Sequence, residues 1–235
     1  MPQLSDLLTT YRASLNDARE TGLIQTGVPG VTFFWDEHSI ERAPLLYEKG
    51  LVIIGQGRKI GYLGGRRFEY SEEACLVIGV PVPFECEAHG TPEEPLLGIR
   101  IDVDLEQLHH LVSRLGHRAE IARELDAQNS RLGVQEARIE GNLLAATSRL
   151  IACLNDPMDV DVLGPGAVDE ILYRVLRSEA GSVLHALTQH HTAYAGISRA
   201  LERMHADYRE SLTIDELAKE SAMSASSFHR AFKKG

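Results

Sequence analysis

Five polar side chains near the end of the sequence have the types and spacing needed to bind nucleic acid. Ser226, His229 and Arg230 lie at positions i, i+3 and i+4, so they share one face if this segment is helical. Arginine can donate two hydrogen bonds to guanine O6 and N7, while serine and histidine can bond to base edges or phosphates. Lys233 and Lys234 follow within the next turn, and lysine suits phosphate oxygens. These five residues are the predicted DNA-binding side chains.

A pair of short helices joined by a turn is predicted to position these side chains. Thr213 and Glu216 have the spacing of a capping box, which predicts the start of a helix. A turn at Ala222-Met223, followed by a capping residue type at Ser224, predicts a second helix. Two phenylalanines in this second helix are expected to pack inward: Phe228 and Phe232. The arrangement is a helix-turn-helix, whose second helix enters the major groove; the alternative is an ordinary helical hairpin with a solvated polar face.

The sequence before residue 104 has the texture of a β domain. Short runs rich in β-branched and aromatic residues alternate with glycine and proline: Val31–Trp35, Leu51–Ile54, Lys59–Leu63, Arg67–Tyr70, Cys75–Ile78 and Leu96–Val103. Gly64-Gly65 is a hairpin signal, because glycine accepts the positive φ that tight turns need. Many short strands at this spacing predict a small barrel or sandwich.

Helical spacing of apolar residues frames this β region on both sides. A helix is expected from Met1 to Thr21, where Gly22 would end it. Asp104 is a candidate cap for a helix that follows the β region. A longer helix is expected over Val134 to Leu154. Five of its apolar residues could form either a dimer contact or part of the monomer core: Ile139, Leu143, Leu144, Leu150 and Ile151.

One stretch carries a more specific pattern than helical spacing alone. The segment Leu201–Lys233 follows the form hxxxxxxxLxxxxLAxxxxMSxxxFxRxFK, and its matching residues are Leu212, Leu217, Ala218, Met223, Ser224, Phe228, Arg230, Phe232 and Lys233. This segment resembles the start of the AraC/XylS-type DNA-binding module. Gln56–Tyr70 and Pro157–Leu176 resemble the N-terminal region of AraC-type regulators. The resemblance therefore spans nearly the whole chain.

The resemblance implies a fold and a division into domains. The expected class is α+β, with an N-terminal cupin-like β-barrel or sandwich, a helical middle and a C-terminal helix-turn-helix fragment. We expect an N-terminal helix over 1–22, a cupin-like sensor barrel over 23–103, a helical dimerisation or linker region over 104–194, and half of the DNA-binding domain over 195–235. Family modules carry two helix-turn-helix units and this sequence ends after the first, so DNA binding is expected to need the second.

The resemblance also implies a function. We expect a ligand-responsive transcriptional regulator that senses a small-molecule inducer in the β domain, forms a homodimer and binds promoter DNA. The turn position that the family often fills with glycine is Ala222 here. If that residue must be left-handed, alanine costs about 1 kcal/mol. Ligand-binding residues cannot be assigned from the sequence.

Composition limits the remaining classes of function. The chain has 235 residues, 43% of them apolar and 25% charged, as in ordinary soluble proteins. Its net charge is −10, yet residues 221–235 contain three basic side chains and no acidic one. No apolar run approaches a membrane span, and no signal peptide is apparent. Three cysteines are an odd count, which favours a reduced, cytoplasmic protein without membrane partners.

The residues that could support enzymatic, metal or redox chemistry lack the partners that such sites need. His38 and His89 do not form the His-x-His pair of cupin metal sites, so no metal and no cofactor are expected. Cys75 and Cys86 could sense an electrophile, although burial as small apolar side chains is favoured. No nucleophile is paired with a base, so the chain is not expected to be an enzyme. A cupin-like enzyme and a truncated antagonist that does not bind DNA are the alternatives.

Overall fold

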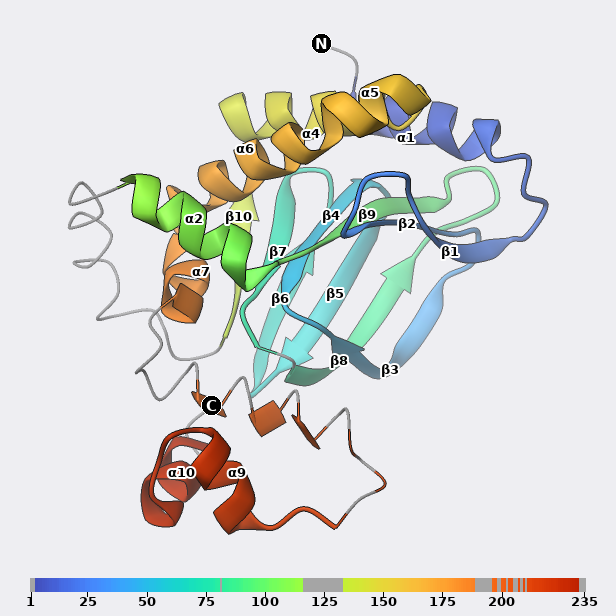
Figure 1. Cartoon of the computed structure of the whole chain (residues 1–235). Coiled ribbons are helices and arrows are strands. Elements are labelled where there is room, and N and C mark those ends of the chain that lie inside the picture. Colours follow the sequence, from blue (N-terminus) through green and yellow to red (C-terminus); the bar gives the residue numbers. More distant parts are fainter. Residues whose placement is uncertain are drawn as a thin grey trace.

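A computed structural model of the chain describes residues 3–80, 82–115, 133–188, 196–197, 200–201, 203–204, 207, 209 and 211–232. Its strands form two antiparallel sheets (Figure 1). The large sheet has the order β1 (Thr21–Gln25), β2 (Val31–Asp36), β9 (Leu96–Asp102), β4 (Gly50–Gln56), β7 (Ala74–Ile78) and β10 (Val134–Arg138). The small sheet has the order β3 (Ile40–Tyr47), β8 (Val82–His89), β5 (Arg58–Leu63) and β6 (Arg66–Tyr70).

Helices cover the face of the large sheet that points away from the small sheet (Figure 1). They are α1 (Leu4–Ser14), α2 (Leu105–Leu115), α4 (Gly141–Cys153), α5 (Pro157–Val162), α6 (Gly164–Leu176) and α7 (Gly181–Thr188). Two further helices lie near the end of the chain: α9 (Ile214–Glu220) and α10 (Ala225–Phe232). The mixed α and β composition expected from the sequence is confirmed.

The two sheets do not close into a barrel. Strands pair within each sheet, and the chain passes from β6 to β7 through a single bridge between Ser71 and Ala74. The expectation of a closed barrel is therefore wrong, and the alternative of two stacked sheets describes the fold. The reason is that the large sheet buries both of its faces, one under helices and one under the small sheet.

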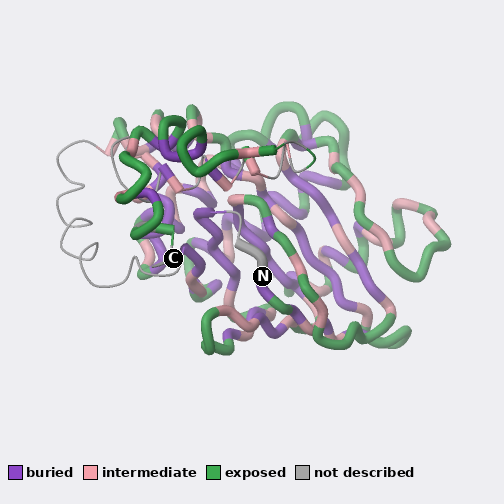
Figure 2. Tube along the Cα trace, turned by 90° about the horizontal axis from the view of Figure 1, so that it is seen from below, coloured by how far each residue is buried: buried purple, intermediate pink, exposed green. Residues whose placement is uncertain are grey.

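β4, one of the two central strands of the large sheet, contributes side chains to two separate cores. Leu51 and Ile53 of β4 pack among the helices, whereas Val52 and Ile54 face the small sheet. All four side chains are fully buried, and buried segments run through the strands in Figure 2. The hairpin predicted at Gly64-Gly65 is confirmed, because both glycines have positive φ between β5 and β6.

The helix expected over 134–154 is wrong in its first part. Residues 134–138 form β10, which pairs with β7 and so extends the large sheet beyond the predicted β region. Glycines with positive φ stand before and after this strand, at 133 and 141. The remaining residues form α4, and its contacts with α1 and α6 bury Leu143, Leu150 and Ile151 within this chain. These side chains therefore belong to the monomer core.

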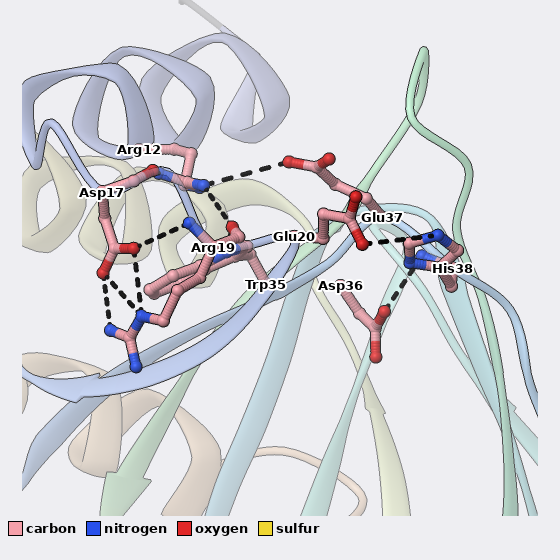
Figure 3. Close-up of polar contacts among 8 residues, drawn as sticks. All are labelled: Arg12, Asp17, Arg19, Glu20, Trp35, Asp36, Glu37 and His38. Carbon is pink, nitrogen blue, oxygen red and sulfur yellow. Dashed lines mark hydrogen bonds and ion pairs between the residues drawn. The ribbon is translucent and has the colours of Figure 1, made fainter.

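A cluster around Trp35 fixes the end of α1 to the large sheet (Figure 3). The guanidinium of Arg12 lies 4.4 Å from the centre of the Trp35 ring and donates to the backbone oxygens of Asp17 and Arg19. Trp35 Nε1 also donates to Arg19 O, at 2.9 Å. A Cβ at Gly22 would lie 2.1 Å from the indole, so Gly22 makes room for the ring within β1.

This cluster corrects the predicted N-terminal helix. The helix ends at Ser14, because Asn16 adopts a positive φ of 50° and the chain turns back to begin β1 at Thr21. Gly22 lies inside a strand and does not terminate a helix. Within the helix, Leu4, Leu8 and Tyr11 form the buried face.

Candidate ligand site and candidate DNA-binding helices

A single lysine projects into the apolar layer between the two sheets. Lys59 of β5 lies on the inner face of the small sheet, opposite Tyr70 of β6 and Ala88 of β8. Its ammonium donates to Tyr47 Oη at 3.0 Å. It also lies 4.7 Å from the centre of the Phe34 ring and 5.6 Å from that of Tyr47. The lysine is only half-buried, so aromatic faces and a hydroxyl replace part of its water shell.

Two further polar groups extend this contact into the core. Tyr70 Oη lies 3.5 Å from Tyr47 Oη and 3.3 Å from Cys86 Sγ. Burial raises the pKa of Tyr70 well above its usual value, and the neighbouring Tyr47 and Cys86 add to the shift. Burial likewise raises the pKa of Cys86, against the opposing effects of Tyr70 and Lys59. Tyr70 and Cys86 are therefore protonated near neutral pH and leave the lysine charge unneutralised.

No carboxylate in the described part of the chain forms an ion pair with Lys59. The core between the two sheets, at whose margin Lys59 lies, is apolar or aromatic: Val52, Ile54, Phe68, Leu76, Ile78, Phe84 and Leu96. A small pocket lies at the margin of this layer, where β6 faces β10, and its interior of about 10 Å³ has room for one water molecule. Its lining combines apolar and polar residues: Leu63, Arg66, Phe68, Leu76, Val134, Gln135 and Glu136. Lys59 is not among the residues that line it. The layer between the sheets thus combines one lysine charge with apolar and aromatic side chains.

Sequence reasoning did not select Lys59, Tyr47 or Tyr70 as site residues. The sequence did contain one signal for Lys59. Lys59, Gly61 and Leu63 are two residues apart in a predicted strand, so they lie on the same face of it. The partners of Lys59 come from strands far apart in the sequence, and only the sheet order brings them together.

The cysteines lie inside the two cores and away from solvent. Burial raises the pKa of the Cys75 thiol to about 12. Because a thiolate is the reactive form, only about one Cys75 in ten thousand is ionised at pH 8. We expect iodoacetamide at pH 8 to leave Cys75 and Cys86 unmodified in the native chain and to modify both in urea. Rapid modification of native Cys75, seen by mass spectrometry, would restore the electrophile-sensing alternative.

Metal ligands and membrane helices are not found where the structure describes the chain. His38 Nε2 lies 3.8 Å from a Glu20 carboxylate oxygen, and His89 Nε2 lies 3.4 Å from a Glu87 carboxylate oxygen. No group of three or more potential ligands is present among the described residues. Within the same residues, no helix is long and apolar enough to cross a membrane.

The predicted pair of helices near the end of the chain is present as α9 and α10. Thr213 accepts from the Glu216 backbone N–H, and the Glu216 carboxylate accepts from the Thr213 backbone N–H, which completes the capping box. Ser224 Oγ accepts from the Ser227 backbone N–H at 3.2 Å and so caps α10. Leu217, Ala218 and Phe228 pack together with Ala200 in a small core of their own.

The structure places three of the five predicted DNA-binding residues on the outer side of α10. Ser226, His229 and Arg230 are exposed, and Phe228 faces the small core. Lys233 and Lys234 lie outside the described residues. Phe232 stacks against Phe228 at 5.6 Å between ring centres but stays 41% exposed, so its predicted inward packing is wrong. Phe228 covers one side of the Phe232 ring, and the other side is exposed to solvent.

The turn between α9 and α10 uses a left-handed alanine. Ala222 has a φ of 54°, a conformation in which the Cβ approaches the following carbonyl oxygen. We expect Ala222→Gly to raise the free energy of unfolding by about 1 kcal/mol, because glycine carries no such clash. Chemical denaturation of α9 and α10, followed by a fluorophore near the turn, measures this change. A loss of stability would mean that the turn in solution is not left-handed.

Comparisons with known proteins agree with this architecture. No curated protein sequence matches the chain. A structure of ToxT from Vibrio cholerae O395 bound to (E)-4-(8-methylnaphthalen-1-yl)but-3-enoic acid is similar, with 9% identity and a TM-score of 0.56. The match covers 86% of this chain and 76% of that one. A second structure of ToxT from Vibrio cholerae O395 gives 9% identity and a TM-score of 0.54, covering 87% of this chain and 74% of that one.

These structural similarities establish a shared fold, and the family follows from the sequence itself. Residues 27–183 match the family described as AraC-type transcriptional regulator N-terminus. The match includes both sheets from β2 onward and most of the helical layer. Since it spans more than half of the chain, this protein belongs to the family of AraC-type transcriptional regulators.

Proposed function

We propose that this regulator responds to a small organic acid held between its two sheets. The observation that carries the proposal is the half-buried Lys59 ammonium, which has aromatic neighbours and no carboxylate partner in the described residues. A buried or half-buried charge without a counter-ion is costly, and an anionic ligand would offset that cost. The acid bound in the similar ToxT structure, which joins a carboxyl group to an aromatic body, supports the same class of ligand.

The polar chain around Lys59 fits a carboxylate in two ways. The ammonium has three protons, and Tyr47 Oη takes one of them, so other donors are available. Tyr47 accepts from Lys59 and keeps its own proton, which it can donate to a ligand oxygen. The apolar and aromatic side chains around this point would then contact the body of the acid.

The proposed acid binding is tested with a panel of aryl and alkyl carboxylates and their neutral amides, assayed by thermal shift. We expect a carboxylate to stabilise the chain and its amide to bind more weakly. Lys59→Met should weaken that carboxylate by about tenfold, because a charge-assisted hydrogen bond is lost. Lys219→Met, an exposed lysine on α9, is the matched control and should bind as the wild type does. Equal binding of acid and amide, or an unchanged affinity in Lys59→Met, would contradict the proposal.

We further propose that α10 binds promoter DNA as part of a helix-turn-helix. Ser226, His229 and Arg230 are exposed together on this helix, and Lys233 and Lys234 follow them in the sequence. Residues 23–103 would form the cupin-like sensor together with β10, residues 104–194 the dimerisation or linker region, and residues 195–235 the first DNA-binding unit. Ligand binding would shift the population of arrangements in which a homodimer presents its two α10 helices to DNA. A cytoplasmic location remains a prediction.

A further inference from the structure

The short helix α5 carries an unusual share of exposed apolar surface. Met158 and Val162 are each 76% exposed, and Leu163 directly after the helix is 51% exposed. Met158 and Val162 are four residues apart, so they lie on one side of the helix, beside Leu163. Figure 1 shows α5 at the outer margin of the helical layer, on the side away from the sheets. Grouped apolar side chains at such exposure are typical of protein contacts.

The scaffold beneath these side chains is fixed. Asp156 caps α5 by accepting from the Met158 backbone N–H at 2.8 Å, and Pro157 occupies the first turn. Val160 is buried on the opposite side, where a Cβ at Gly27 would lie 2.7 Å from its Cγ1. Gly27 thus lets α5 approach the chain before β2 closely. Met158, Val162 and Leu163 therefore stand on a helix that is capped and packed against the rest of the chain.

The charged residues next to α5 in the sequence have a single sign. Residues 155–169 contain four aspartates and no lysine or arginine. Asp156 is used as the helix cap, and Asp169 accepts from Gln107 Nε2 at 2.7 Å. Asp159 and Asp161 are exposed and form no ion pair with the described residues. The apolar side chains of α5 are therefore flanked by two carboxylates that have no cationic partner among the described residues.

We propose that Met158, Val162 and Leu163, with Asp159 and Asp161, form a docking surface for a cationic amphipathic helix of another protein. Leucine-like side chains of such a helix would cover the apolar residues, while its lysines or arginines would meet the two carboxylates. A second copy of this chain fits less well, because two-fold packing would place the aspartates of both copies against one another. The net charge of −10 favours a cationic partner in the same way.

The docking surface is tested on the whole chain with a defined probe. The probe is a fluorescent peptide of about eighteen leucines and lysines at helical spacing, with a glutamate-for-lysine peptide as its counterpart. Fluorescence anisotropy measures binding to the wild type, to Met158→Gln/Val162→Gln and to Asp159→Asn/Asp161→Asn. One control is Leu23→Gln, which removes an apolar side chain 62% exposed on β1. The other is Glu93→Gln/Glu94→Gln, which removes two exposed carboxylates elsewhere.

We expect the wild type to bind the lysine peptide and not the glutamate peptide. Each α5 variant should weaken that binding by at least about fivefold, while both controls stay within about twofold of the wild type. Equal weakening by the controls would mean general charge attraction and would overturn the proposal, as would unchanged binding in the α5 variants. Sedimentation of the same proteins is the second arm. Self-association that disappears in Met158→Gln/Val162→Gln would instead identify α5 as a contact between copies of this chain.

Discussion

Replacing Trp35 with alanine is expected to lower the free energy of unfolding by about 3–5 kcal/mol. The indole is 2% exposed, stacks against Phe33 at 5.6 Å between ring centres, and donates to the Arg19 backbone oxygen. Its loss opens a cavity between α1 and the large sheet and removes the ring under the Arg12 guanidinium. Trp35 is the only tryptophan of the chain, so urea unfolding should be followed by far-ultraviolet circular dichroism.

Trp35→Phe is the matched control for this prediction. A phenyl ring keeps the stacking on Phe33 and loses the hydrogen bond to Arg19, so the expected cost is about 1–2 kcal/mol. The two variants together separate packing from hydrogen bonding. A loss of less than about 1 kcal/mol in Trp35→Ala would contradict the role of this cluster in fixing α1, because removing a buried aromatic ring normally destabilises a core by several times that amount.

Replacing Arg230 with alanine is expected to weaken DNA binding by about a hundredfold. An arginine that contacts guanine contributes roughly 1–3 kcal/mol, and the proposed homodimer would lose that contact twice. The chain joined to a second helix-turn-helix unit, which DNA binding is expected to need, is tested against duplexes selected from a randomised library. Fluorescence anisotropy at a fixed salt concentration measures the affinity. Affinity for the selected sites should fall far more than affinity for random duplex, because a base contact carries sequence information.

Arg177→Ala serves as the control for Arg230. Arg177 is an exposed arginine at the end of α6 whose guanidinium donates to Tyr173 Oη. Its removal deletes the same charge at a place far from α10 in the sequence, and DNA affinity should stay within about twofold. An equal loss of DNA affinity in both variants would mean that Arg230 contributes only its positive charge and makes no specific base contact. An unchanged affinity in Arg230→Ala would contradict α10 as the reading helix.

The sequence predicted the strands whose composition is strongly apolar and missed those whose pairing depends on distant partners. β4, β7 and β9 are rich in valine, leucine and isoleucine because both faces of the large sheet are covered. Residues 134–138 contain only two buried side chains and two charged ones, a pattern that also fits a helix. Their strand conformation is set by hydrogen bonding to β7, which lies more than fifty residues earlier in the chain.

The same distinction separates the two candidate sites. The capping box and the cap at Ser224 are local features, and residues a few positions apart were enough to predict them. The left-handed conformation of Ala222 was considered only because the family often has glycine at that position. The lysine site depends on side chains from β2, β3, β5, β6 and β8, which only the completed sheets bring together. Local spacing places Lys59 on the inward side of its strand but does not identify the residues of the other strands that it contacts.

The central claim is that an acid bound beside Lys59 controls DNA binding, and the most direct test measures both in one titration. The affinity for a selected duplex is measured with and without a saturating carboxylate, for the chain joined to a second helix-turn-helix unit, with the wild-type sequence and with Lys59→Met. We expect the acid to change the wild-type affinity for DNA by about fivefold or more, while Lys59→Met binds DNA like the unliganded wild type and does not respond to the acid. An acid that binds the chain yet leaves its DNA affinity unchanged, or an equal response in Lys59→Met, would contradict this claim.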